Sequence, residues 1–184
     1  MREAADPEAA WQHWREARDE LFRTHPQSPL PPVARTAFRG LEYFAYDPAA
    51  RVTAEVADAP AEPEPVRTSG PEPLVFRRFG RASFELGGRP LELELYWLEG
   101  YGGGVFLPFR DETSGRETYG GGRYLLDTVK GADLGREGDA WVVDLNFAYH
   151  PSCVYDHRWV CPLAPPGNRI GVPTPVGELL PEGY

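Results

Sequence analysis

The sequence predicts a mainly β fold, α+β by content: an antiparallel β-barrel or sandwich of short strands with an amphipathic helix at the N-terminus. The first observation behind this prediction is composition. The 184 residues include 20 Gly and 20 Pro, which favours many turns and short strands over long helices. The second is that alternating or short apolar segments recur at hairpin-like spacing, which gives about eight to ten strands.

Length and charge limit the classes of protein and partner. The length fits a single domain over residues 1–184, with an N-terminal helical arm (1–38), a β-rich core (39–162) and a Pro-rich C-terminal wrap (163–184). A net charge of -9 repels phosphate backbones, so we expect no nucleic-acid partner. No apolar run is long enough to cross a membrane, and residues 1–6 contain no apolar signal core, so we expect no membrane partner and a cytoplasmic location.

Residues 7–24 have the spacing of an amphipathic helix. Asp6 is placed to cap it, and Pro7 suits a first turn, where its missing N–H is not needed. Pro26 ends the helix, because the residue before a proline is pushed out of the α region. The apolar stripe that we expect to pack onto the sheet consists of Trp11, Trp14, Ala17, Leu21 and Phe22.

The segment that follows predicts one helical turn over 32–38 and then a hairpin. Its strands are 41–46 and 51–56, and Asp47-Pro48-Ala49-Ala50 forms the turn. Residues 58–73 contain five prolines among several acids, which is typical of a surface loop or an interrupted edge strand.

The clearest hairpin is predicted around Gly87-Gly88. The following segment 91–97 places Leu on one face and Glu on the other, and two glycines supply the positive φ angles of a two-residue turn. Further strands are expected at 74–79, 105–109, 123–126 and 140–145. The tail after Pro162 is expected to lie on the surface.

The candidate binding residues lie in the Gly-, Tyr- and Arg-rich stretch 101–153. Tyr101-Gly-Gly-Gly and Tyr119-Gly-Gly-Gly form a near-repeat whose backbone N–H groups suit close approach to a ligand. Glycines at sheet bulges, where another strand or ring packs close, are the favoured explanation. An Arg walled by aromatic rings suits an anionic ligand, but Arg123 can also pair with an internal carboxylate. The ligand-binding set is Arg110, Asp111, Tyr119, Gly121, Arg123, Tyr124, Asn146 and Tyr149.

Two residues are candidates for a reacting group. Asp144 ends a predicted strand and shares a face with Asn146, so it can act as a general base or simply satisfy a turn. Cys153 lies in the string His150-x2-Cys153-x3-His157-x3-Cys161. That string allows a zinc site, a disulfide, two buried thiols or a Cys153 nucleophile with a neighbouring His, and a reducing compartment favours thiols. We assign no metal ligands, and the sequence names no cofactor.

The same residues carry a family resemblance. The strings Thr118-Tyr-Gly-Gly-Gly-Arg-Tyr124 and Asn146-Phe-Ala-Tyr-His-Pro-Ser-Cys153, with the later Cys161-Pro162, resemble a bacterial family known only as a domain of unknown function. The resemblance runs from the first helix to nearly the C-terminus. It implies no substrate, cofactor or mechanism, and its pattern has Asn at the position of His150 and no regular His at position 157.

Two functions from different classes follow. The first is a soluble β-rich module that binds a small, anionic molecule in a pocket formed by residues 101–153. The second is a hydrolase-like enzyme that uses the same pocket, with Asp144 or Cys153 as reacting group and Arg123 as electrostatic clamp. A structural protein stapled by zinc or a disulfide is a third alternative. Oligomeric state stays open.

Overall fold

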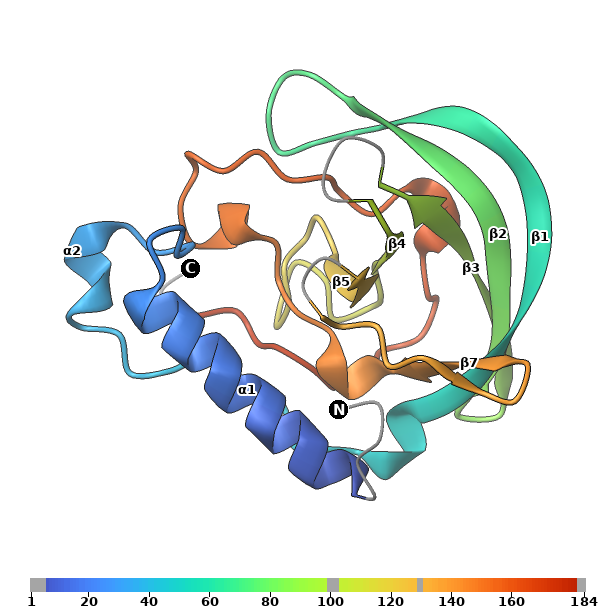
Figure 1. Ribbon diagram of the computed structural model, residues 1–184, viewed down its shortest axis with the longest axis horizontal. Coiled ribbons are helices and arrows are strands. Elements are labelled where there is room, and N and C mark those ends of the chain that lie inside the picture. The colour runs from blue at the N-terminus through green and yellow to red at the C-terminus, as the bar shows by residue number, and fades with distance from the viewer. Residues whose placement is uncertain (1–5, 99–102, 129–130, 182–184) are drawn as a thin grey trace.

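The computed structural model describes residues 6–98, 103–128 and 131–181 (Figure 1). The mainly β prediction is confirmed. The described helices and strands are α1 (Pro7–Thr24), α2 (Pro32–Arg35), β1 (Arg51–Val66), β2 (Leu74–Leu86), β3 (Arg89–Trp97), β4 (Val105–Phe109), β5 (Arg123–Asp127), β6 (Arg136–Glu137) and β7 (Ala140–Asp144). In Figure 1 the long, curved β1 and β2 lie on one side of the molecule and α1 on the opposite side. No helix in the described ranges is long and apolar enough to span a bilayer.

The described strands form one antiparallel sheet in the order β5-β4-β3-β2-β1-β7-β6. Because β5 and β6 end it without pairing to each other, the sheet is not a closed barrel and is sandwich-like. The count of described strands is seven rather than eight to ten, partly because the strand predicted at 74–79 and the residues that lead into Gly87 belong to one continuous strand, β2.

Both faces of the β3–β5 region are buried. Leu95, Leu107 and Leu125 face one hydrophobic cluster, which the sheet curls around. Their sequence neighbours Tyr96, Phe106 and Tyr124 face a second cluster, which also contains Trp11 and Trp14 of α1. Successive strand residues point to opposite faces, so burial on both faces explains why β4 and β5 are buried along their whole length.

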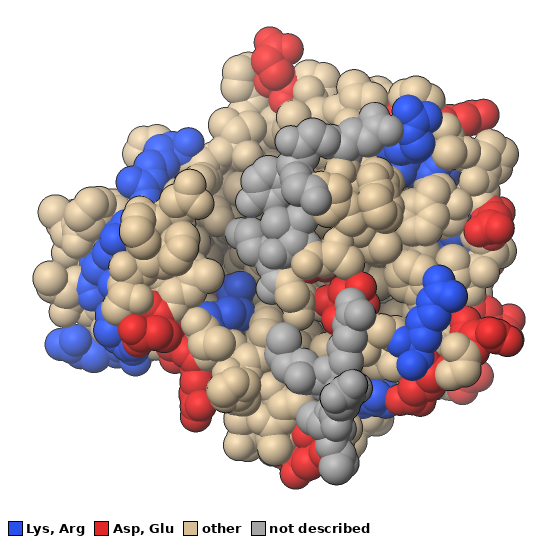
Figure 2. Space-filling view, in the orientation of Figure 1, with Lys and Arg blue, Asp and Glu red and all other residues tan. Residues whose placement is uncertain are grey.

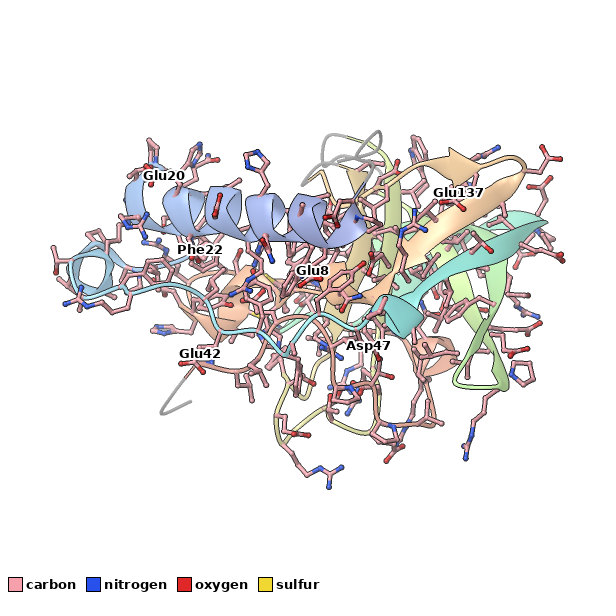
Figure 3. The ribbon with its side chains drawn as sticks, turned by 90° about the horizontal axis from the view of Figure 1, so that it is seen from below. Glu8, Glu20, Phe22, Glu42, Asp47 and Glu137 are labelled. Atoms are coloured by element: carbon pink, nitrogen blue, oxygen red, sulfur yellow. The ribbon has the colours of Figure 1, made fainter. Side chains whose placement is uncertain are left out.

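Helix α1 begins and ends where the sequence predicts. The Asp6 carboxylate accepts hydrogen bonds from the N–H groups of Glu8 (3.0 Å) and Ala9 (3.2 Å), and the helix ends at Thr24. In Figure 3, Glu20 points away from the body of the molecule and Phe22 points into it.

The predicted apolar stripe of α1 is partly wrong. Trp11, Trp14 and Phe22 are buried as expected, but Ala17 and Leu21 are exposed. Arg18 occupies the inward position between Trp14 and Phe22, with only 13% of its side chain exposed. An Arg is tolerated there because its guanidinium lies over the rings of Trp14 and Tyr149 and bonds to Glu178.

The two-residue hairpin is confirmed. Gly87 and Gly88 join β2 to β3 with φ angles of 58° and 74°, and Leu86 pairs with Arg89. Such angles suit glycine, since they lie in the left-handed region. Residues 32–35 form the predicted helical turn.

The hairpin predicted over 41–57 is wrong. Residues 41–46 form no strand with 51–56. They run instead beside the C-terminal segment, where Tyr43 forms a bridge with Glu178 and the Phe44 N–H donates to Gly177 O. The cause lies in β1, whose first four residues pair with β7 on one side and whose remainder pairs with β2. The turn residues Asp47–Ala50 form a short 3₁₀ helix, but their local preference does not determine which strand β1 pairs with.

The proline-rich segment continues β1 to Val66. Pro63 and Pro65 lie opposite Arg77 and Val75 of β2, and Pro60 lies in the irregular stretch between Asp58 and Glu62. Pairing with β7 covers only residues 51–54, so the other side of this part of β1 is an edge in the described sheet. The interrupted edge strand was therefore the better of the two predictions.

The C-terminal segment is more deeply packed than predicted. Ile170 and Val176 are 1% and 3% exposed and belong to the first hydrophobic cluster, and Glu178 is fully buried. Its backbone bonds to strand and loop positions, for example Ile170 N–H to Arg110 O and Leu180 N–H to Glu117 O at 2.9 Å. The segment therefore completes the core rather than covering it.

Candidate functional site

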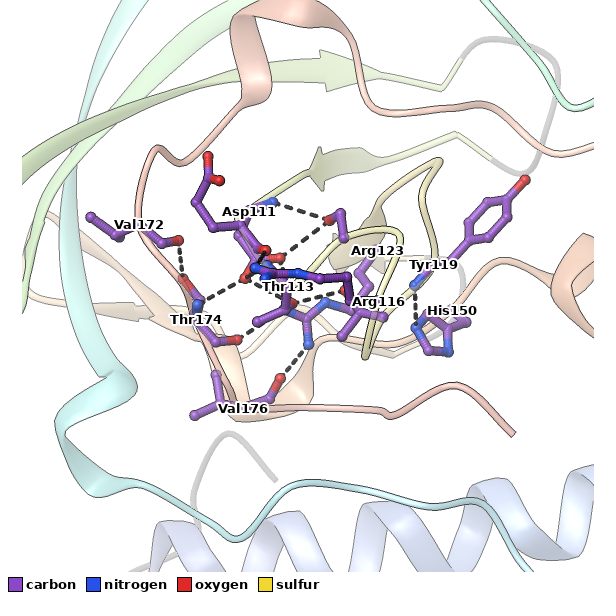
Figure 4. A network of polar contacts seen from close by, with 12 residues as sticks. Asp111, Thr113, Arg116, Tyr119, Arg123, His150, Val172, Thr174 and Val176 are labelled. Carbon is purple, nitrogen blue, oxygen red and sulfur yellow. Dashed lines mark hydrogen bonds and ion pairs between the residues drawn. The ribbon is translucent and has the colours of Figure 1, made fainter. Parts of the chain in front are cut away.

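The predicted centre of the site, Arg123, lies in a sealed polar cluster (Figure 4). Its side chain is fully buried and donates to Asp111 Oδ1 (3.3 Å), Thr174 O (3.1 Å) and Val176 O. The cation also lies over the Phe109 ring, 5.1 Å from its centroid. Burial lowers the pKa of Arg123, while Asp111 opposes that shift. We call this cluster the Arg123 network.

Asp111 is equally engaged. Its carboxylate accepts from the Thr113 N–H (3.2 Å) and hydroxyl (2.9 Å), and from the Thr174 N–H (2.8 Å). Thr113 in turn shares a hydrogen bond of 2.9 Å with Thr118. The network thus ties the loop after β4 to the start of β5 and to the C-terminal segment, and Asp111 acts as the turn-forming residue that its sequence context allowed.

The second glycine triplet is closely packed. A Cβ at Gly121 would meet the Tyr119 ring and lie 2.8 Å from a Leu163 methyl, and one at Gly122 would lie 2.6 Å from Phe109 O. Gly122 also has a φ of 101°. These glycines are required where a ring and a strand approach the backbone. In the first triplet, Tyr101 and Gly102 lie outside the described residues.

Asp144 and Asn146 form a second buried polar cluster. Asp144 Oδ1 accepts from the Asn146 N–H (3.0 Å) and side-chain amide (2.8 Å), and burial raises the pKa of Asp144. Asn146 exchanges two further hydrogen bonds with the backbone of Asp47, and its carbonyl accepts from the Trp11 indole at 2.8 Å. The pair therefore joins the end of β7 to α1 and to the turn before β1.

A cavity of about 620 Å³ lies elsewhere, between α1, one end of β2 and the segment 149–162. We call it the helix-side cavity. Of the predicted site residues, only Tyr124 and Tyr149 belong to its lining; Arg110, Asp111, Tyr119, Gly121, Arg123, Asp144, Asn146 and Cys153 do not. Most lining side chains are apolar or aromatic: Leu21, Phe22, Pro29, Leu74, Val75, Phe76, Leu98, Phe106, Tyr124, Tyr149, Pro151, Trp159, Val160 and Pro162.

Few charges reach this cavity, and they are compensated. The Tyr149 hydroxyl donates to Asp127 Oδ2 at 2.7 Å, and the Tyr124 hydroxyl donates to Pro162 O at 2.7 Å. Arg18, which lines the cavity, forms an ion pair of 2.7 Å with Glu178, which does not. Burial lowers the pKa of Arg18, but Tyr43 and Glu178 outweigh it and the net shift is upward, so Arg18 stays charged.

A buried His–Glu pair lies at the cavity, and His150 is part of the lining. His150 Nε2 accepts from the Tyr119 N–H at 3.2 Å, which places the proton of neutral His150 on Nδ1. That atom lies 3.9 Å from Glu178 Oε1, and neither atom has a hydrogen-bond partner among the described residues. Burial lowers the pKa of His150 well below 6.5 and raises that of Glu178 to about 7. His150 is therefore neutral at ordinary pH, whereas Glu178 changes its charge near neutral pH.

The mouth of the cavity is apolar. Leu21, Leu74, Val75 and Val160 line it and are 39–57% exposed, four of the six large apolar side chains found exposed among the described residues. Basic and acidic side chains are interspersed on the face in Figure 2, over the helices as well as over the strands. Apolar surface gathered at one opening marks a contact site more clearly than scattered exposed residues do.

Sequence reasoning missed this set because most of its members look like ordinary core residues. One usable signal was Leu74-Val75, two adjacent apolar residues at the start of a strand, since one of them must face away from the core. Arg18 was not among the residues of the predicted apolar stripe. Trp159 and Val160 gave no signal beyond their proximity to the cysteines.

The four potential zinc ligands do not gather. The His157 side chain is fully exposed, whereas His150 is buried and engaged by Tyr119. Within the described residues, no three His, Cys, Asp or Glu side chains are placed to hold one metal ion. Cys153 and Cys161 are not joined by a disulfide, although their side chains interact directly.

Comparison with known proteins agrees with the predicted resemblance. Residues 36–179 match the family described as Protein of unknown function (DUF1684). The chain is similar to an uncharacterised protein from Haloarcula marismortui with a solution NMR structure, at 32% identity and a TM-score of 0.67, over 96% of each chain. No curated protein matches. With the family matched over most of its length, this chain belongs to the DUF1684 family.

Proposed function

We propose that this protein binds a small, largely apolar and uncharged molecule in the helix-side cavity. The observation that carries the proposal is the cavity itself, about 620 Å³ with a mainly apolar wall and an apolar mouth. Ligand pockets typically enclose about 300–1,000 Å³ and combine such walls with a few fixed polar groups. Here Tyr149 with Asp127 supplies the polar anchor. The cytoplasmic location expected from the sequence forms part of the same proposal.

The charge balance favours an uncharged ligand over the anionic one expected from the sequence. That expectation rested on Arg123, whose side chain has no exposed surface and bonds to Asp111. At the cavity, the positive charge of Arg18 is offset by Glu178, His150 is neutral, and Asp127 contributes a carboxylate. An anion would meet no uncompensated positive charge there.

The test uses two fluorescent probes that share one skeleton. N-phenyl-1-naphthylamine is neutral, and 8-anilinonaphthalene-1-sulfonate is the same molecule with a sulfonate. We expect the neutral probe to bind at a single site at least ten times more tightly than the anionic probe. Tighter binding of the sulfonate would overturn the uncharged-ligand proposal and restore the anionic one.

A variant whose new side chain fills the cavity tests whether the probe binds there. Ser152 lines the cavity and its side chain has no hydrogen bond with a described residue, so Ser152→Trp adds bulk to the wall without removing a bond that holds the fold. We expect it to weaken neutral-probe binding at least tenfold. Val33→Trp is the matched control, since Val33 is 84% exposed and does not line the cavity. Equal binding by the two variants would place the probe elsewhere.

An enzyme in the same place is the second candidate, and Cys153 is the residue that favours it. Hydrogen bonding by Cys161, which lines the cavity, lowers the pKa of Cys153 to about 6 although burial opposes the shift. Asp144 gives the enzyme less support, because it caps a turn away from the cavity. The Cys153 thiol can also react by thiol–disulfide exchange, which needs no ligand in the cavity.

A further inference from the structure

The segment 150–163 brings two cysteines together beside the helix-side cavity. Cys153 is half-buried, Cys161 is 8% exposed, and their side chains are hydrogen-bonding neighbours. Cys161 belongs to the cavity wall. No third metal-binding side chain joins them among the described residues, so the pair stands as a dithiol.

The end of this segment that carries Cys161 is held by hydrogen bonds to residues outside the short loop between the cysteines. The Cys161 N–H donates to Ser69 Oγ at 3.0 Å, and the Ser69 N–H donates to Cys161 O at 2.9 Å. Between the cysteines, the Trp159 indole donates to Pro29 O at 3.2 Å. The meeting of the two thiols is therefore fixed by the fold and is not an accident of a loose loop.

The surroundings favour the thiolate of Cys153. Its Sγ lies 3.9 Å from the Tyr119 hydroxyl oxygen, and Ser69 is a further hydrogen-bond donor. Cys161 makes the largest contribution, and together these donors lower the pKa of Cys153 to about 6 against the effect of burial. At pH 7 most of Cys153 is then ionised, and the thiolate is the form that attacks disulfides.

We propose that Cys153 and Cys161 form a redox-active dithiol, which a low-molecular-weight disulfide oxidises to an intramolecular disulfide. The Cys153 thiolate attacks one sulfur of the external disulfide, whose S–S bond breaks and releases one thiolate. Cys161 loses its proton to that thiolate and attacks the Cys153 sulfur, which breaks the mixed disulfide and releases the second thiolate. Two protein thiols are oxidised, and one external disulfide is reduced to two thiol equivalents.

The different burial of the two cysteines assigns their roles. Cys153 is the more exposed and attacks first, whereas Cys161 is shielded from an external reagent but adjacent to the mixed disulfide. Because Cys161 lines the cavity, oxidation also alters the wall against which a bound molecule packs.

Oxidised glutathione and intact-mass measurement test the proposal. In wild type we expect loss of two hydrogens and no lasting adduct. Cys161→Ala is expected to accumulate one glutathione adduct on Cys153, because the resolving thiol is gone. Cys153→Ala is expected to react at least tenfold more slowly. A lasting adduct on wild type, or equal rates in the two variants, would overturn the proposal.

Alkylation by iodoacetamide gives an independent readout. The rate in wild type is expected to rise with a midpoint near pH 6, and the midpoint of Cys161→Ala is expected to move upward because the main hydrogen-bonding partner is lost. A wild-type midpoint above roughly pH 8, the value of an ordinary thiol, would contradict the assigned environment. Serine variants replace the alanine variants if circular dichroism shows that either alanine chain is unfolded.

Discussion

The Arg123 network and the helix-side cavity are built from side chains of opposite polarity. The network gathers charged and hydroxyl side chains, excludes solvent and bonds them to one another. The cavity is walled by apolar rings and aliphatic side chains and opens through an exposed apolar mouth. The contrast teaches that a cluster of Arg, Asp, Gly and Tyr in the sequence is as typical of a buried polar joint as of a binding site. Exposed apolar surface gathered around an opening indicates a candidate binding cavity more directly.

The largest effect is expected from Arg123→Ala. It leaves the Asp111 carboxylate buried without its cation, so we expect a loss of about 3–5 kcal/mol in the free energy of unfolding, measured in urea. Arg110→Ala is the matched control next to Asp111. Arg110 is exposed and its backbone bonds persist, so a change within about 0.5 kcal/mol is expected.

Probe binding by Arg123→Ala tests whether the Arg123 network and the helix-side cavity have separate roles. Chains of Arg123→Ala that remain folded at low temperature should bind the neutral probe as wild type does, because Arg123 does not line the cavity. A stable Arg123→Ala protein that had lost probe binding would reverse the roles given to the two regions.

A pH effect on stability is expected from Glu178. Burial raises its pKa from 4.5 to about 7, so between these values the native state binds more protons than the unfolded chain. The contribution of Glu178 to the free energy of unfolding therefore falls as pH rises through this window, by on the order of 3 kcal/mol.

The difference between wild type and Glu178→Gln isolates that contribution. Burial lowers the pKa of His150, which gives a slope of opposite sign and persists in the variant. We expect the stability of wild type relative to Glu178→Gln to decline from pH 4.5 to 7 and then level off. A difference that does not change with pH would mean that Glu178 titrates normally.

A smaller effect is expected from Tyr149→Phe. The hydroxyl donates to Asp127 at 2.7 Å, and its removal should cost about 1 kcal/mol in urea unfolding. Because Tyr149 and Asp127 both line the cavity, affinity for the neutral probe should change as well. Altered stability with unaltered probe affinity would confine this pair to a structural role.

The smallest effect on stability is expected from Leu21→Gln at the mouth. Leu and Gln have similar helix propensities and Leu21 is 39% exposed, so the free energy of unfolding should stay within about 0.5 kcal/mol of wild type. Neutral-probe affinity should nevertheless fall. Ala17→Gln, exposed on the same helix but outside the cavity lining, should change neither quantity.

Local signals in the sequence were enough to predict where helices and turns begin and end, but not which strands pair with one another. The Asp6 cap and Pro26 set the limits of α1, and Gly87-Gly88 defined the hairpin, because those signals act within a few residues. The pairing of β1 with β7 and the bridge from Tyr43 to Glu178 depend on segments far apart in the chain, which no local pattern specifies.

The candidate site was harder to predict for a physical reason. Tyr124 and Tyr149 entered the predicted set through their sequence neighbours, and both line the cavity. Arg123 drew attention through its charge, but burial of a charge requires partners, and the fold supplied them. The apolar wall has no sequence signature distinct from that of a core, because both consist of the same side chains.

The prolines of β1 have a consequence for behaviour at high concentration. Beyond Ala54 the strand presents an edge in the described sheet, and such an edge is a template on which a second chain can pair and begin a fibril. Pro60, Pro63 and Pro65 carry no N–H to offer an incoming strand, and the acidic residues between them repel a like-charged copy. A composition that suggested a surface loop or an interrupted edge strand thus serves as protection against aggregation.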